Sequence, residues 1–296
     1  MEAGTVTPVT GCGRPLWAIG DPGRAALEIG PSAPPRHAGS ADVEISTATL
    51  DGMRVLAASV RGLMHLRTAE VRQDAFALGR TADPEQLVAV VCDGVGSLGR
   101  SHEASSLVSR SVSTTVAGGA PLADAIAHAN SELARLGEQA LRDGASADRS
   151  VDGMATTAIA MVVRREDDDW VGELAWVGDS SCWHLDAEGR WSQIAGAAPD
   201  EDENGFYTGR VTPLPSSDGA CETLAFRRTG GALFLLSDGV ANPLAWNPAV
   251  QDALAGWWAA PPDPLTFAAQ VGFACKTHMD DRTAVGIWPG APDMAS

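Results

Sequence analysis

Four aspartates stand next to short apolar runs, at positions where a buried strand would end. Asp93, Asp179 and Asp238 closely follow such a run, and Asp280 stands just before the last one. A carboxylate at the tip of a buried strand loses solvation, which is costly unless it is paired or bound to a cation. Glycines beside three of these acids let the backbone turn tightly and approach a ligand. Four acidic strand ends meeting at one edge of a sheet would repel one another and would require divalent cations.

The ligands of such a site would be oxygen atoms. Hard oxygen donors without a cluster of cysteine and histidine favour Mg²⁺ or Mn²⁺ over zinc. A turn former or a helix N-cap is the commoner role for any single aspartate. Because an aspartate recurs at four strand ends, a metal site is favoured. The metal site and the turn or N-cap role both stay open at this point.

Length and composition are typical of a globular protein. The chain has 296 residues, 45% hydrophobic and 20% charged, enough for one large domain or two small ones. A net charge of −17 argues against a nucleic-acid or anionic membrane partner. The five cysteines are scattered without CxxC spacing, which predicts buried thiols in a reducing compartment. Since no apolar run could span a bilayer and no secretory signal is visible, we expect a cytoplasmic protein.

The chain divides into an extension, a domain and a tail. Residues 1–40 are rich in Gly, Pro and Ala, and we expect a flexible or draped extension with Trp17 as candidate anchor. A single catalytic domain is expected over residues 41–290, followed by a tail at 291–296. Within the domain, the polar stretch 195–220 is long enough to predict a mobile flap beside the site.

The hydrophobic pattern of the domain predicts strands with helices grouped between them. Apolar and β-branched runs predict strands at residues 55–60, 74–78, 87–92, 155–163, 170–177, 181–185, 234–236 and 283–288. Helical spacing predicts helices at residues 101–116 and 121–141, and residues 247–277 are also expected to be helical. This order indicates an α+β fold with antiparallel sheets rather than alternating βαβ units.

Six short segments occur in the order found in one known family. They are Gln73–Ala75, Asp93–Ser97, Asp152–Thr157, Gly178–Ser180, Ser237–Gly239 and Asp280–Thr283. In this order they resemble the metal-dependent serine/threonine protein phosphatases of type 2C over residues 43–288, and the chain looks like a diverged bacterial-type member. Each segment alone is weak evidence for the family, but six segments in this order over the right chain length are specific evidence.

The resemblance implies a fold and a two-metal centre. The fold would be a four-layer αββα sandwich, two antiparallel sheets flanked by helices, with two Mg²⁺ or Mn²⁺ ions at one edge. Asp93 would bridge both ions, and the Gly94 carbonyl would bind one of them. Asp238 and Asp280 would hold the other ion. Asp74 would be catalytic through metal-bound water.

Two further acids have a place in the family pattern. Asp179 is the candidate for a third, weaker metal position, and Asp152 is a second candidate there. Both lie in segments that carry the resemblance.

The residues that would hold the substrate phosphate depart from the family pattern. Many members place an arginine just before a Glu-Asp-Ala segment, whereas here His65 follows the matching glycine and the stretch to Asp74 is longer. His65 is therefore a candidate catalytic and phosphate-binding residue, although a lone histidine is more often packed or solvated. Arg67 and Arg72 are the other candidates for the phosphate clamp.

The implied chemistry agrees with the residue types. Two divalent ions close together can lower the pKa of a bridging water and stabilise in-line displacement at phosphorus. No phosphoenzyme nucleophile is then needed. Cys92 is better interpreted as a strand residue, because no Cys-x5-Arg phosphate loop surrounds it.

Three functions compete at this point. The first is a metal-dependent phosphatase that removes phosphate from phosphoserine or phosphothreonine in proteins by attack of a metal-bridging water, opposing a serine/threonine kinase. The altered arginine position motivates the second, a catalytically weak regulatory or phosphate-sensing module on the same fold. The third is a nuclease or phosphodiesterase, against which the negative charge and the absence of a basic stripe count.

Overall fold

The computed structural model describes residues 8–10, 15–23, 26, 35, 41–82, 84–95, 97–146, 148, 152–196 and 212–290. The expected tail at residues 291–296 and most of the expected flap at 195–220 lie outside these ranges. No helix in the described ranges is both long enough and apolar enough to cross a membrane.

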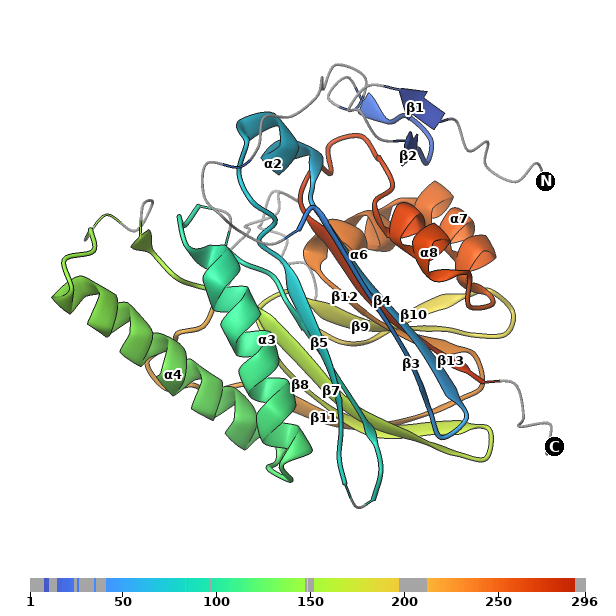
Figure 1. The fold of residues 1–296 in the computed structure, drawn as a ribbon. Helices are drawn as coiled ribbons and strands as arrows, with labels where there is room; N and C mark the ends of the chain where they lie inside the picture. Colours follow the sequence, from blue (N-terminus) through green and yellow to red (C-terminus); the bar gives the residue numbers. More distant parts are fainter. Residues whose placement is uncertain are drawn as a thin grey trace, which may run out of the picture.

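Two antiparallel sheets form the centre of the molecule (Figure 1). The first has six strands in the spatial order β10 (Trp191–Ala195), β9 (Ser181–Leu185), β12 (Ala232–Leu236), β13 (Arg282–Pro289), β4 (Met53–Val60) and β3 (Val43–Leu50). The second has five strands in the order β11 (Glu222–Thr229), β8 (Asp169–Val177), β7 (Ala158–Glu166), β6 (Leu87–Cys92) and β5 (Ala75–Arg80). A separate short pair, β1 (Pro8–Thr10) and β2 (Pro15–Trp17), lies near the N-terminus.

The two sheets enclose a central hydrophobic layer. Alternate residues of a strand point to opposite faces, so Ala57 of β4 and Ala89 of β6 lie in this layer. Their neighbours Ala58 and Val90 face the outer layers instead. Because both faces of these strands are covered, the sequence there is continuously apolar rather than alternating.

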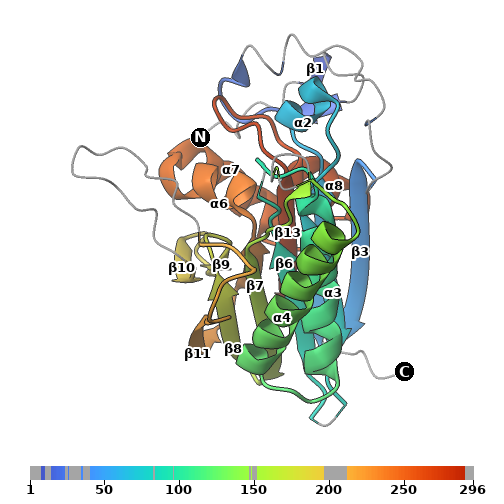
Figure 2. The ribbon, with the colours of Figure 1, turned by 90° about the vertical axis from the view of Figure 1, so that its left-hand side faces the viewer.

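One pair of helices covers the five-stranded sheet. They are α3 (Ser101–Ala117) and α4 (Leu122–Arg142), which lie together on its outer face (Figure 2). Their buried residues, among them Val108, Val112 and Ile126, pack on Val90 and its neighbours. These two helices match the prediction from helical spacing to within one residue at each end.

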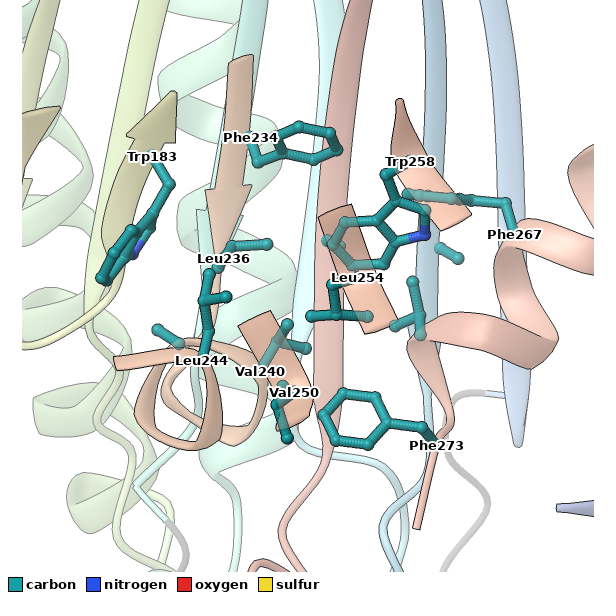
Figure 3. Packing of buried hydrophobic residues seen from close by; sticks show 14 of the residues in the cluster. Trp183, Phe234, Leu236, Val240, Leu244, Val250, Leu254, Trp258, Phe267 and Phe273 are labelled. Carbon is teal, nitrogen blue, oxygen red and sulfur yellow. The ribbon is translucent and has the colours of Figure 1, made fainter. Parts of the chain in front are cut away.

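Three helices cover the six-stranded sheet: α6 (Asp238–Trp246), α7 (Pro248–Trp258) and α8 (Pro264–Val271). Their apolar side chains meet the sheet in an aromatic cluster (Figure 3). Phe234 of β12 stacks on Trp258 with ring centroids 5.1 Å apart, and Trp258 Nε1 donates to Gln270 Oε1 over 3.0 Å. The chain therefore folds as helices, sheet, sheet and helices, the four-layer α+β sandwich that the sequence predicted.

Local capping explains where α7 and α8 begin. The Asn247 side chain accepts the Ala249 N–H, and the Asp263 side chain accepts the N–H groups of Leu265 and Thr266. Each cap is followed by a proline at the first helical position, where no N–H is needed.

Some predicted boundaries were wrong. The helical stretch expected over residues 247–277 is divided into α7 and α8, because Pro261 and Pro262 between them cannot continue a helix, and it ends at Val271. The strand expected from residue 155 begins at Ala158, since Thr156 makes isolated bridges to Gly94 and Leu214. Two short helices, α2 (Leu63–Thr68) and α6, were not predicted.

Part of the N-terminal extension packs on the domain. The ring of Trp17 meets Trp257 edge-on, with centroids 5.1 Å apart. Ile19 and Ala26 are buried. These described residues are thus draped over the core rather than separate from it.

Candidate active site

The acids that the sequence singled out come from both sheets. Asp74 immediately precedes β5 and Asp93 immediately follows β6, and the pairing of Ala75 with Cys92 brings these two acids to the same sheet edge. Asp238 follows β12 and begins α6, and Asp280 shortly precedes β13. Strands β12 and β13 are neighbours in the other sheet, so all four acids approach one edge of the sandwich.

A hydrogen bond joins the two sheets at this edge. Thr283 Oγ1 at the start of β13 donates to Asp74 Oδ2 over 2.8 Å. Burial, together with Asp281 and Asp280, raises the pKa of Asp74 to about 8. The raised value reflects several negative charges held close together.

Asp93 and Asp238 face each other. Burial and the nearby Asp74, Asp238 and Asp280 raise the pKa of Asp93 well above its ordinary value. Burial and Asp280 raise the pKa of Asp238 to about 7. The buried Asp238 Oδ1 receives no hydrogen bond from any described residue. An acceptor-only oxygen beside a second carboxyl fits a divalent cation, which would satisfy both groups.

The Asp93 turn is held by two threonines. The Asp93 carbonyl accepts the Thr157 N–H over 2.8 Å and the Thr156 hydroxyl over 2.8 Å. Gly94 fits here because a Cβ would lie 2.7 Å from the Gln73 carbonyl oxygen. The threonines of the segment Asp152–Thr157 thus support the backbone at Asp93.

Asp179 and Asp152 differ in their surroundings. Burial and Asp280 raise the pKa of Asp179, and the charge of Asp179 raises the pKa of Asp238. Asp179 therefore lies close to the carboxylates of Asp238 and Asp280. Asp152 instead accepts the Ser146 N–H over 2.6 Å. Of these two candidates, the structure brings Asp179 to the other carboxylates.

A cleft of about 410 Å³ opens beside the acids. Its lining includes His65, Asp238, Asn242, His278 and Asp280. Asp280 is exposed at this cleft, although partial burial and Asp281 raise its pKa.

His65 is held in the cleft by a buried acid. Its Nδ1 donates to Asp281 Oδ1 over 2.9 Å, and Asp281 is 1% exposed. Although burial lowers the pKa of His65, the hydrogen bond and charge of Asp281 raise it above its ordinary value overall. The same carboxylate accepts the Gly62 N–H over 2.6 Å and the Gln73 N–H over 2.5 Å.

One tight group of ligand atoms occurs in the described part of the chain. Atoms of His65, Asp280 and Asp281 all lie within 4.8 Å of one another. Because Asp281 already accepts three hydrogen bonds, we interpret it as a structural acceptor. Asp280, which is exposed, is then the carboxylate of this group that could hold a cation.

The two candidate arginines lie apart from the cleft lining. Arg72 is buried, with Nε donating to the Ala41 carbonyl over 3.0 Å and Nη2 to Glu44 Oε2 over 2.5 Å. It therefore ties the start of β5 to β3. Arg67 is exposed in the last turn of α2. Of the three phosphate candidates, His65 is the one among the described lining residues.

Sequence reasoning missed the roles of Asp281 and Arg282. The buried Arg282 donates to the Gly239 and His278 carbonyls and lies 4.0 Å over the Phe273 ring. Burial lowers its pKa to about 10. Strand alternation was the available signal, since adjacent residues entering β13 must face opposite sides.

Comparisons with known proteins agree with this architecture. The family model described as Protein phosphatase 2C matches residues 61–269. No curated protein matches the chain.

Solved structures give the same result for the fold. A bacterial serine phosphatase is similar with a TM-score of 0.55 and 16% identity, over 85% of this chain and 99% of that one. Serine/threonine phosphatase Stp1 from Staphylococcus aureus has a TM-score of 0.52 and 15% identity, over 86% and 99%. PppA from Pseudomonas aeruginosa, described as a key regulatory component of T6SS, has a TM-score of 0.52 and 21% identity, over 82% and 99%. The family match covers more than half of the sequence and the fold is shared, so the chain belongs to the protein phosphatase 2C family.

Proposed function

We propose that this protein is a Mg²⁺- or Mn²⁺-dependent phosphomonoesterase that removes phosphate from phosphoserine and phosphothreonine in proteins. The observation that carries the proposal is the facing pair Asp93 and Asp238, with the buried Asp238 Oδ1 lacking a donor among the described residues. Such a pair is stable near neutral pH only with a proton or a cation between the carboxyls.

The cation ligands would be those the family pattern implies. Asp93 and the Gly94 carbonyl would hold one ion, Asp93 would reach the second, and Asp238 and Asp280 would complete the second site. Asp179 would serve a third position. When bound, such ions activate water and neutralise charge on the phosphoryl group.

The protein's own residues would orient the reactants. Asp74 is fixed by Thr283 through Oδ2, and its carboxylate would accept a hydrogen bond from the attacking water. His65, fixed through Nδ1, lines the cleft and would contact the substrate phosphate through Nε2. Asn242 and His278 line the same cleft and would contact the peptide that flanks the phosphorylated residue.

The substrate would be a phosphoprotein made by a serine/threonine kinase. The names of the similar structures support this class, since they describe serine and serine/threonine phosphatases. Cys92, Cys182, Cys221 and Cys275 are free thiols, which supports a reducing compartment such as the cytoplasm.

A phosphothreonine peptide assay with Mn²⁺ tests the function. The wild type should release phosphate, Asp93→Asn should abolish release, and Asp168→Asn, at a side chain that is 94% exposed, should leave it unchanged. Metal-independent release, or full activity in Asp93→Asn, would contradict the proposal.

One observation favours a second candidate, a phosphate-sensing module with weak catalysis. The described cleft lining contains His65 where many family members have an arginine, and Arg72 is committed to Glu44. Saturable phosphopeptide binding without turnover, with Mg²⁺ and with Mn²⁺, would support this candidate. Robust hydrolysis would exclude it.

A further inference from the structure

A small hairpin forms one wall of the cleft. It connects α8 to β13, and Cys275 pairs with His278 across the turn, with the His278 N–H donating to the Cys275 carbonyl over 3.2 Å. Thr277 in the turn has a φ of 72°, in the left-handed region. The inner arm carries His278, Met279 and Asp280 into the cleft lining. The position of Asp280 therefore depends on how this hairpin is held.

The inner arm is held by hydrogen bonds from α2 and from β13. The Met64 N–H donates to the Met279 carbonyl over 2.9 Å, and Arg282 Nη2 donates to the His278 carbonyl over 2.9 Å. The first bond links the hairpin to α2, the helix that carries His65, and the second links it to the start of β13.

The outer arm is held by the N-terminal extension. The Ala274 N–H donates to the Trp17 carbonyl over 2.7 Å, and the Ile19 N–H donates to the Ala274 carbonyl over 3.0 Å. Farther along, the Lys276 N–H donates to the Asp21 carbonyl over 2.9 Å. The segment Trp17–Asp21 thus runs parallel to the outer arm and satisfies its backbone.

Side chains of the extension pack against the core beneath α6–α8 and against α2. Ile19 is 5% exposed in the cluster between α6–α8 and the six-stranded sheet. Ala18 and Ala26 pack with Leu63, Leu66 and the partly buried Met279. The same extension residues therefore contact α2 and the inner arm, close to His65 and Asp280.

The ion pair at the tip of the hairpin contributes little to holding the extension in place. Lys276, the single lysine of the chain, places Nζ 3.2 Å from Asp21 Oδ2. Both side chains are more than half exposed, so solvent screens the pair. Backbone pairing and the burial of Ile19 hold the segment.

We propose that the segment Trp17–Asp21 is a positioning element of the active site, which sets the affinity for divalent cations by fixing the hairpin that carries Asp280. The inference rests on the proposed role of Asp280 as a metal ligand. It assigns a function to part of the extension, which would otherwise only cover apolar surface. Loss of its contacts leaves the buried Ala274 N–H and carbonyl without partners, and the cleft wall becomes free to move.

The test compares two variants of the full chain, each with one buried side chain truncated to alanine. Ile19→Ala loosens the segment, and Leu185→Ala is the matched control in the same cluster, at the far end of β9 and 2% exposed. Hydrogen exchange over residues 272–281 and Mn²⁺ affinity by titration calorimetry are measured for both, alongside thermal unfolding. Ile19→Val is the conservative variant that keeps most of the packing.

In Ile19→Ala we expect faster hydrogen exchange in the hairpin and a roughly tenfold weaker affinity for Mn²⁺. A loss of affinity of this size is typical when a residue that supports a metal ligand is mutated. Leu185→Ala should change neither, and Ile19→Val should retain most of the wild-type affinity. Equal exchange and equal affinity in Ile19→Ala and Leu185→Ala would overturn the proposal. If Ile19→Ala does not fold, Ile19→Val must show the same changes at smaller size, and their absence also overturns it. A failed phosphatase assay leaves the exchange result standing, so the two proposals fail separately.

Discussion

Asp281 Oδ1 accepts hydrogen bonds from His65 Nδ1 over 2.9 Å and from the Gly62 N–H over 2.6 Å. A residue entering β13 thereby fixes both the start of α2 and the ring that faces the cleft. Since Nδ1 is engaged by Asp281, Nε2 is the ring nitrogen that would contact the substrate in the proposed reaction. Asp281 links the orientation of His65 to the strand that follows Asp280.

Replacing Asp281 with asparagine should affect orientation and stability together. The amide offers N–H groups where the backbone already offers donors, so we expect the unfolding free energy to fall by about 1–3 kcal/mol. We also expect kcat/KM for a phosphothreonine peptide to fall roughly 10- to 100-fold, as for other supporting residues. Normal kinetics in Asp281→Asn at a temperature where it stays folded would show that the acid has no positioning role.

The phosphate candidates can be separated by KM. His65→Asn should raise KM for the phosphopeptide by roughly 10-fold, about 1.4 kcal/mol of binding free energy. Arg67→Ala, on the exposed turn of α2, should leave KM unchanged. Arg72→Ala should lower the melting temperature without raising KM, because its partners are Ala41 and Glu44. A large rise in KM in either arginine variant would assign the clamp to that residue instead.

Gly239 has no room for a side chain. A Cβ there would overlap the Asp281 carbonyl oxygen, a backbone atom that cannot move freely. Gly239→Ala should therefore destabilise the fold by about 1–3 kcal/mol and disturb the adjacent Asp238. Gly256→Ala is the control: Gly256 lies inside α7 with open space around it, and alanine should stabilise the helix by about 0.5–1 kcal/mol. The two variants are compared by chemical denaturation, and equal effects would contradict the packing argument.

The acidic cluster should make the metal-free protein sensitive to pH. Asp74 and Asp238 have folded pKa values raised to about 8 and about 7, so the native state holds protons that the unfolded state has released. Stability from these groups is therefore present at low pH and is lost as pH rises through the folded values. In EDTA, we expect the unfolding free energy to fall between pH 5.5 and pH 8.5.

Mn²⁺ should reverse this dependence. A cation bound by the ionised carboxylates favours the folded state most at high pH, where no protons compete. Denaturant unfolding at both pH values, with EDTA and with Mn²⁺, measures the effect. Stability in EDTA that rises with pH, or an Mn²⁺ effect that is larger at the lower pH, would contradict the arrangement.

The sequence was sufficient for the layers and for the main acids. Continuous apolar runs such as Leu87–Cys92 predict strands covered on both faces, and the acids at their ends share a sheet edge because β5 and β6 pair antiparallel. Helices α3 and α4 were predictable because their apolar spacing extends over several turns. Helix α2 has only six residues, too few for a period to appear.

Contacts between distant segments could not be read from the sequence. The bond from Arg72 to Glu44 depends on where β3 lies, and an arginine near the site looks the same whether it faces a phosphate or a strand. Pairing of Ile19 with Ala274 joins residues from opposite ends of the chain without any local signal. Asp281 was visible as an acid, but its donors come from a different part of the chain.

Crystals grown with Mn²⁺ test the central claim most directly, through the anomalous scattering of the ion. We predict two strong peaks at the sheet edge, both within coordination distance of Asp93, with Asp238 and Asp280 on one of them. Peaks confined to exposed acids elsewhere, or a fully loaded crystal with no peak beside Asp93, would contradict a two-metal phosphatase centre.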